Sequence, residues 1–144
     1  MMRRLCLACI FSILCAARPA GACVCADMGT LADEYRRSSA VFVGRIVSLE
    51  ISTMVVEGHA VENMVATFEV ERRWKGPSAR RLRVQTCGTQ MLVCTCGVDF
   101  QLGQRYVVFA EGKLLQTNSC NRTTVADAAG DGLLESLDAV ARRK

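Results

Sequence analysis

The sequence predicts a mainly β domain that is stapled by disulfides and follows an export signal. Three observations carry this prediction. Residues 1–22 have the pattern of a secretory signal peptide, an even number of cysteines follows them, and stretches of β-branched or alternating apolar residues recur over residues 41–117. The 144-residue length fits one domain, and no repeat, low-complexity segment or linker divides residues 23–144.

The export signal has three parts. Arg3 and Arg4 precede an uncharged, mostly apolar run over residues 5–17, and small residues end the segment at Ala20-Gly21-Ala22. The run is shorter than the roughly 20 residues that a bilayer span needs. We therefore expect cleavage after Ala22, secretion, and no membrane span; an uncleaved anchor or a buried helix is the alternative.

Cleavage changes the charge of the chain. It removes three arginines, so 18 basic residues become 15 against 14 acidic ones, and the net charge falls from +4 to +1. The basic character of the whole chain therefore comes largely from the signal peptide. It gives no ground for expecting a nucleic-acid partner.

Cleavage also leaves an even number of cysteines. An even number in an exported chain indicates three disulfides, for which six cysteines allow 15 pairings. A metal site of four thiolates from the two Cys-x-Cys pairs is the alternative, although its spacing is tighter than zinc sites usually show. The six are Cys23, Cys25, Cys87, Cys94, Cys96 and Cys120.

A short helix should open the domain. Thr30 can cap it, and Asp33 three residues later completes a partial capping box. Leu31 and Tyr35 would share one face, and we expect the helix to end near Ser38.

A β-branched strand is expected over residues 41–51, with Gly44 marking a bulge or a sharp bend. An irregular stretch over 51–63 contains His59 and is expected to separate this strand from the next.

Four further strands are predicted from alternation and β propensity, over residues 65–74, 81–86, 105–110 and 113–117. In the first two of these, one set of alternating apolar residues should face the core. That set is Ala66, Phe68, Val70, Leu82 and Val84.

A final helix should begin at Asp131 as its N-cap, with Arg142, Arg143 and Lys144 complementing its C-terminal dipole. Its apolar stripe is Leu133, Leu134, Leu137 and Val140. Five strands with a helix near each end favour a five-stranded OB-fold, a Greek-key barrel in which closure removes exposed edges. A five-stranded sandwich is the alternative.

The placement of Cys23 and Cys25 points to a use for the new N-terminus. In an extended segment their side chains lie on one face, so bonds to two separate partners would hold a chain end that normally frays. Each bond to a distal partner would contribute about 4–5 kcal/mol in the loop-entropy model. Two such bonds suggest that the position of the N-terminus is used in function. The alternative is that the disulfides only stabilise the fold.

Several motifs occur in a family-like order: the Cys-x-Cys start, a Val-Phe-Val-Gly strand, Trp74-Lys75-Gly76, residues 96–100 (CGVDF), residues 103–108 (GQRYVV) and Cys120. In this respect residues 23–125 resemble the netrin-like tissue inhibitors of metalloproteinases, in particular their compact single-domain bacterial members. The resemblance implies an OB-fold and the pairs Cys23–Cys96 and Cys25–Cys120, with Cys87 and Cys94 joined across a hairpin tip.

The resemblance also implies a mechanism. The free α-amine and carbonyl of Cys23 would chelate the catalytic zinc of a target metalloprotease, in the position that such zinc keeps open. Val24 would enter the specificity pocket of the protease, and Cys25 and Ala26 would extend the contact. The hairpin around Met91, Leu92 and Val93 would lie beside them.

The chain departs from the family pattern in three ways. Val24 stands where strong inhibitors have Thr or Ser, no cysteine lies between Cys25 and Cys87, and the C-terminal subdomain of the animal inhibitors is absent. In addition, Ala20-Gly21-Ala22-Cys23 partly resembles a bacterial lipoprotein box. Lipidation would block both the amine and the thiol of Cys23 and anchor the protein, and a periplasmic location is a further alternative to secretion.

Other site classes find less support in the sequence. His59 is the single histidine, so the partners of a catalytic triad or of a zinc-water enzyme are missing, and we expect a monomeric binding protein without a cofactor. Arg80, Arg81 and Arg83 form a basic cluster. The alternative function is therefore a netrin-like module that binds another extracellular protein or a polyanion.

Overall fold

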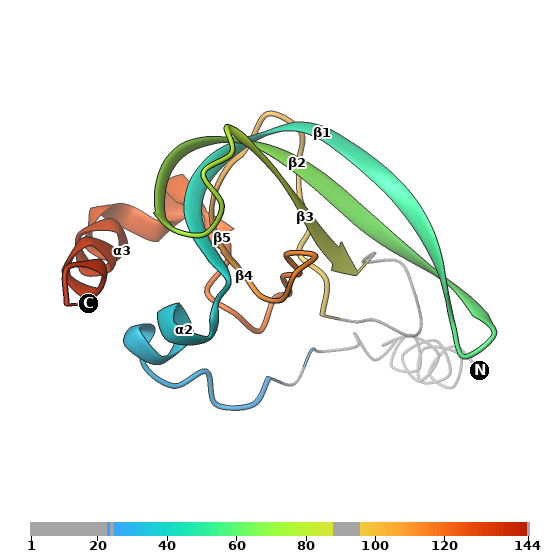
Figure 1. Ribbon diagram of the computed structural model, residues 1–144, viewed down its shortest axis with the longest axis horizontal. Helices are drawn as coiled ribbons and strands as arrows, with labels where there is room; N and C mark the ends of the chain where they lie inside the picture. The colour runs from blue at the N-terminus through green and yellow to red at the C-terminus, as the bar shows by residue number, and fades with distance from the viewer. Residues whose placement is uncertain (1–22, 24, 88–95, 144) are drawn as a thin grey trace, which may run out of the picture.

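The computed structural model describes residues 23, 25–87 and 96–143. This part of the chain forms one five-stranded antiparallel sheet and two helices (Figure 1). The strand order is β3-β2-β1-β4-β5. This confirms a mainly β fold with a short N-terminal and a C-terminal helix. The elements are α2 (Leu31–Arg37), β1 (Ala40–Val56), β2 (His59–Lys75), β3 (Arg81–Cys87), β4 (Arg105–Ala110), β5 (Thr124–Val125) and α3 (Ala126–Ala141).

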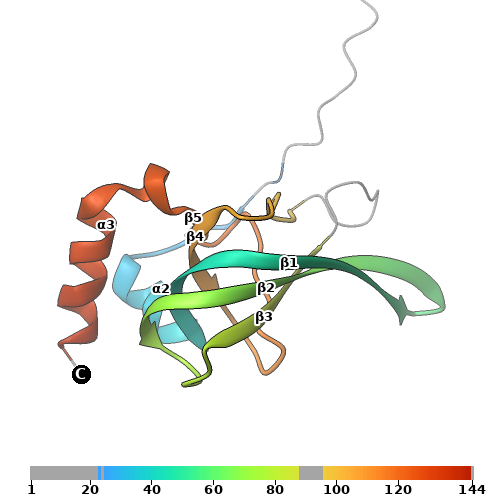
Figure 2. The ribbon, with the colours of Figure 1, turned by 90° about the horizontal axis from the view of Figure 1, so that it is seen from above.

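Strands β1 and β2 form one long hairpin whose far end projects beyond the rest of the sheet (Figures 1 and 2). The irregular stretch predicted over residues 51–63 is therefore wrong, because pairing continues from Ile51↔Met64 to Val56↔His59. Glu57 and Gly58 both have positive φ, 50° and 82°. A two-residue turn of this kind matches the twist of its flanking strands and lets the ladder run to the tip.

The expected irregularity at Gly44 is present. The β1–β2 register shifts between Val43 and Gly44, and a Cβ atom on Gly44 would lie 2.8 Å from the backbone oxygen of Glu69. The neighbouring strand therefore approaches more closely here than any side chain would allow.

The predicted strand over residues 113–117 is wrong. Only Gln116 forms isolated bridges, to Glu111 and Gln85, and the fifth strand is instead β5, which pairs with β4. Leu115 has a φ of 48°, a left-handed conformation that interrupts an extended strand.

Backbone hydrogen bonds nevertheless connect this segment to the opposite edge of the sheet. The Gln85 amide donates to the Leu115 carbonyl and the Thr117 amide donates to the Gln85 carbonyl, both at 2.9 Å. Within the described ranges, these bonds join β3 to the segment that follows β4. Full closure into an OB-fold barrel stays a prediction.

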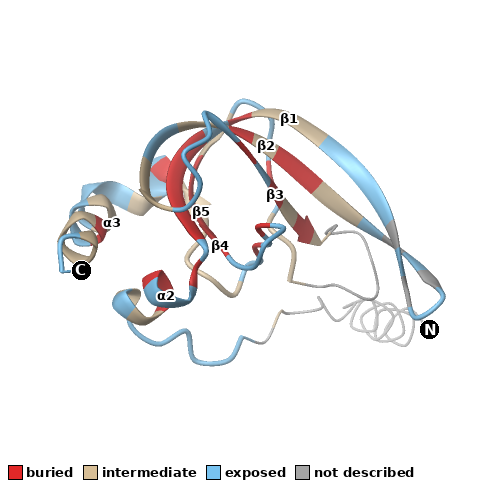
Figure 3. Ribbon diagram, viewed as in Figure 1, coloured by how far each residue is buried: buried red, intermediate tan, exposed pale blue. Residues whose placement is uncertain are grey.

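Apolar side chains pack on both faces of the sheet. Figure 3 shows the buried residues, in red, along its strands. Phe42 and Ile46 of β1 lie in one cluster, where Phe68, Phe100 and Tyr106 make edge-to-face ring contacts. All five predicted inward residues belong to this cluster: Ala66, Phe68, Leu82 and Val84 are buried, and Val70 is half-buried against them.

The other face is covered by the two helices. Val41, Val43, Val107 and Phe109 pack there against Tyr35 of α2 and Leu137 of α3, with further α3 side chains around them. The predicted stripe of α3 is confirmed, since Leu137 is buried and Leu133, Leu134 and Val140 pack against the same cluster.

The helix boundaries agree in part with the sequence. Thr30 caps α2 and forms a capping box with Asp33, and the helix ends before Ser38, as predicted. Helix α3 begins at Ala126, earlier than predicted, but Gly130 within it has a non-helical conformation with a φ of 66°, so the helical segment that carries the predicted stripe begins directly after this kink, at the predicted position. No helix in the described part of the chain is long and apolar enough to cross a membrane.

Candidate functional site

Two disulfides fix the segment that begins at Cys23. Cys23 is bonded to Cys96 with a Cα–Cα distance of 5.3 Å, and Cys25 to Cys120 with a Cα–Cα distance of 5.2 Å. This is the pairing that the family resemblance implies for these four residues. Cys87 is also disulfide-bonded, whereas its expected partner Cys94 lies outside the described residues.

The two disulfides touch each other. The Sγ atom of Cys23 lies 3.3 Å from that of Cys120 and 3.9 Å from that of Cys25. The two receiving segments are themselves joined, because the Ser119 amide donates to the Cys96 carbonyl at 2.8 Å. Four sulfur atoms from three distant parts of the chain thus meet at one point.

The described part of the predicted contact surface is accessible. Cys25 and Ala26 are exposed, and Cys23 is half-buried. The other predicted contact residues, Val24, Met91, Leu92 and Val93, lie outside the described residues. We use "N-terminal ridge" below for the predicted contact segment Cys23, Val24, Cys25 and Ala26.

An ion pair between the buried Glu34 and the half-buried Arg122 supports the chain that leads from the N-terminal ridge into α2. Glu34 is 1% exposed, and its Oε1 accepts a hydrogen bond from the Arg122 amide at 2.6 Å. The Arg122 guanidinium lies 3.1 Å from Glu34 Oε2 and donates to the Gly29 carbonyl at 2.9 Å. Burial raises the pKa of the Glu34 carboxyl above its ordinary value, although Arg122 acts in the opposite direction.

The loop that carries Arg122 holds the N-terminal segment at two points. Arg122 follows Cys120 by two residues, so the same short loop holds Cys25 through sulfur and Gly29 through a hydrogen bond. Arg37 adds a third tie by donating to the Met28 carbonyl at 3.0 Å. Residues 25–30 are therefore exposed to solvent yet anchored at both ends.

The network around Glu34 was not visible in the sequence. Glu34 and Arg122 are 88 residues apart, and neither belongs to a recognisable motif. The available signal was a glutamate on the same side of the predicted helix as Leu31 and Tyr35, the face that turns toward the core.

The basic cluster over residues 80–83 carries nearby acidic partners. Arg80 pairs with Glu69 at 2.8 Å and Arg83 with Glu50 at 3.1 Å. Exposed ion pairs of this kind are weak, but they lower the local positive potential.

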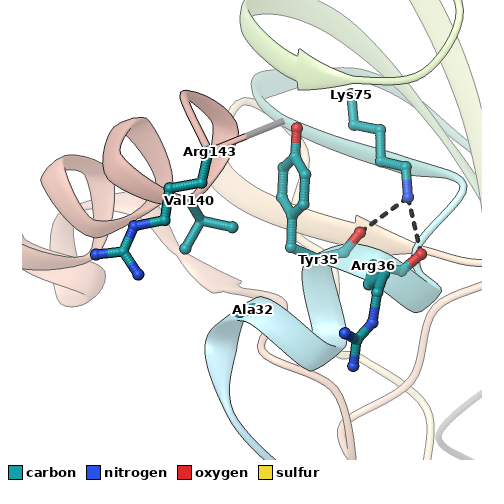
Figure 4. A pocket seen from close by; sticks show the side chains of 6 residues that line it. All are labelled: Ala32, Tyr35, Arg36, Lys75, Val140 and Arg143. Atoms are coloured by element: carbon teal, nitrogen blue, oxygen red, sulfur yellow. Dashed lines mark hydrogen bonds between the residues drawn. The ribbon is translucent and has the colours of Figure 1, made fainter.

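A cavity of about 220 Å³ lies between α2 and α3 (Figure 4). The Lys75 ammonium at its edge donates to the carbonyls of Tyr35 and Arg36, both at 2.9 Å. Lys75 therefore closes the C-terminal end of α2, where unpaired carbonyls attract a cation. This contact explains the position of Lys75 as part of helix packing.

Comparison with known proteins does not assign the chain to a family. No protein-family profile matches the chain, and no curated protein matches it.

Proposed function

We propose that the chain is exported, cleaved after Ala22, and acts as an inhibitor of zinc metalloendopeptidases through the α-amine and carbonyl of Cys23. The observation that carries the proposal is the pair of adjacent disulfides on Cys23 and Cys25. Disulfides persist in oxidising compartments, which supports export as part of the proposal.

The proposed chemistry needs only the first residue of the processed chain. A catalytic zinc site keeps one coordination position for water or substrate. An α-amine has a pKa of about 8, so a useful fraction is neutral at physiological pH and can donate its lone pair. The amine nitrogen and the carbonyl oxygen of one residue can bind the same ion and displace the water that the protease uses.

Rigid presentation supports the proposal energetically. Ordering a free chain end on binding costs about 1–2 kcal/mol per residue in backbone entropy. The bonds from Cys23 to Cys96 and from Cys25 to Cys120 already hold this segment before any partner arrives. A preorganised segment loses less entropy when it enters a protease cleft.

The remaining contacts are those that the family resemblance implies. Val24 would fill the protease specificity pocket, Cys25 and Ala26 would continue along the cleft, and the segment containing Met91, Leu92 and Val93 would flank it. Cys25 and Ala26 are exposed, as this role requires.

The test extends the processed N-terminus by one alanine. Chelation needs a free amine on Cys23, and a preceding peptide bond turns that amine into an amide without a lone pair for zinc. We expect the extended protein to lose inhibition across a panel of zinc endopeptidases while its thermal unfolding stays unchanged. A matched control carries the same alanine after Lys144 and should inhibit like the native protein. Equal inhibition by the N-terminally extended protein would place the binding surface elsewhere.

The alternative function, a module that binds another extracellular protein or a polyanion, has less support at its basic cluster. The acidic partners Glu69 and Glu50 beside Arg80 and Arg83 do not favour a polyanion there.

A further inference from the structure

Four cysteine sulfur atoms from three separate segments gather where the N-terminal segment is bonded to Cys96 and Cys120. Cys23 and Cys25 come from the N-terminal segment, Cys96 follows β3 and Cys120 precedes β5. The Sγ atoms of Cys23, Cys25 and Cys120 all lie within 4.8 Å of one another, and Cys96 Sγ is bonded to Cys23. We call these four residues the tetracysteine cluster.

The spacing of the tetracysteine cluster is close to that of a zinc–thiolate centre. Zinc binds four thiolates tetrahedrally at about 2.3 Å, which places neighbouring sulfurs about 3.8 Å apart. The contacts between the two disulfides, 3.3 Å from Cys23 to Cys120 and 3.9 Å from Cys23 to Cys25, lie within about 0.5 Å of this spacing. In a zinc centre the two bonded pairs would have to separate, and Cys96 Sγ, which lies outside the group of three sulfurs within 4.8 Å of one another, would have to move toward Cys25 or Cys120.

The chain around the cluster is also held by contacts that do not depend on sulfur. The Ser119 amide donates to the Cys96 carbonyl at 2.8 Å, and the Cys120 amide donates to Asn118 Oδ1 at 2.8 Å. Arg122 holds Gly29 on the N-terminal side. These hydrogen bonds do not involve sulfur, so reduction leaves their donors and acceptors in place, and zinc binding by the four thiolates would supply folding free energy where the two disulfides no longer do.

We infer that the reduced protein binds one Zn²⁺ through the thiolates of Cys23, Cys25, Cys96 and Cys120. Each disulfide accepts two electrons and two protons from a dithiol, which itself becomes a disulfide, and two such exchanges give four thiols. Zn²⁺ then replaces the four thiol protons, which are released to solvent. Zinc binding and oxidation therefore compete for the same four sulfur atoms.

This site does not depend on the proposed inhibition of proteases. The tetracysteine cluster would have two alternative states: two disulfides, or one metal centre with four thiolate ligands. Both states tie the N-terminal ridge to the segments around Cys96 and Cys120. Zinc would thus hold the same chain arrangement under reducing conditions that the disulfides hold under oxidising ones.

The experiment uses the purified exported protein before and after reduction with a phosphine, which converts each disulfide and one water into two thiols and a phosphine oxide. Zinc binding is measured by competition with a chromophoric chelator, and Co²⁺ serves as the spectroscopic probe. We expect no zinc binding by the oxidised protein and one Zn²⁺ per reduced chain. The Co²⁺ form should show the intense absorption of tetrahedral thiolate coordination.

Two double variants that retain the same number of cysteines distinguish zinc binding by the tetracysteine cluster from zinc binding by any four thiols. Cys25→Ser with Cys120→Ser removes two cluster ligands and should weaken zinc binding on the order of 100-fold or more. Cys87→Ser with Cys94→Ser keeps all four and should bind like the native reduced protein. Equal losses in both variants, binding by the oxidised protein, or a cobalt spectrum without thiolate bands would each overturn the inference. Fluorescence of Trp74 reports whether each variant is folded, and the comparison between variants holds in either case.

Discussion

Glu34 shows how one side chain can position a loop far away in the sequence. It lies on α2, is 1% exposed, and accepts a hydrogen bond from the Arg122 amide beside the Cys25–Cys120 disulfide. A buried backbone amide without an acceptor costs about 1–3 kcal/mol. The carboxylate therefore contributes to the anchoring of the N-terminal ridge as well as to the packing of the helix.

Substituting Glu34 tests this role. Glu34→Ala leaves the Arg122 amide without its acceptor and should lower the free energy of unfolding by about 1–3 kcal/mol, whereas Glu34→Gln keeps a carbonyl acceptor and should lose less. Urea denaturation of the two variants beside the native protein measures the difference. Equal stability of Glu34→Ala and the native protein would remove Glu34 from the anchoring network.

The same residue makes stability depend on pH. Burial raises the pKa of Glu34 in the folded protein, so the folded state holds this proton more tightly than the unfolded chain does. The contribution of Glu34 to the free energy of unfolding therefore falls as pH rises from the ordinary glutamate pKa to the raised one. Asp33 and Asp138, whose pKa values are lowered, contribute the opposite slope. The Glu34 contribution is therefore the difference between the native protein and Glu34→Gln, measured by denaturation over the acid range, and this difference should fall as pH rises.

At the residue scale, local chemistry was predictable and distant pairing was not. Thr30 and Asp33 form the expected capping box because both partners lie within one helical turn. The ion pair of Glu34 with Arg122 needs the folded sheet to bring its partners together. The cysteine pairing is similar, since the sequence left 15 possibilities and only the family resemblance selected among them.

At the scale of elements, strands with long periodic patterns were predicted and short ones were not. The alternation that begins at Ala66 located β2 and its buried face. Strand β5 has two residues, Thr124 and Val125, which is too short to leave a pattern. The hairpin tip was missed because Glu57-Gly58 is an unremarkable pair until its positive φ angles are known.

The close approach of β2 to Gly44 of β1 gives an element-scale prediction. A Cβ atom there would meet the Glu69 oxygen at 2.8 Å and Phe68 Cβ at 3.3 Å, so Gly44→Ala should destabilise the protein by about 1–3 kcal/mol. Gly132→Ala is the matched control, because nothing lies within 4 Å of a Cβ atom at that helical position. The control should be neutral or gain up to about 1 kcal/mol. Urea denaturation of both variants decides, and a Gly44→Ala protein as stable as the control would contradict the close approach.

For the whole molecule, the two ridge disulfides matter both for stability and for function. They span 73 and 95 residues, and each contributes about 4–5 kcal/mol in the loop-entropy model. That is a large share of the roughly 5–15 kcal/mol by which native domains are stable. These two disulfides hold the segment that begins at Cys23, and the proposed inhibition requires this segment to be rigid.

The central claim depends on a free amine at Cys23, so the most direct measurement is the N-terminus of the exported protein. Intact mass and Edman degradation should show a chain that starts at Cys23, with an unmodified amine, three disulfides and no titratable thiol after unfolding. A chain that begins elsewhere, or a mass that includes a diacylglycerol or an acyl group on Cys23, would contradict zinc chelation by this residue.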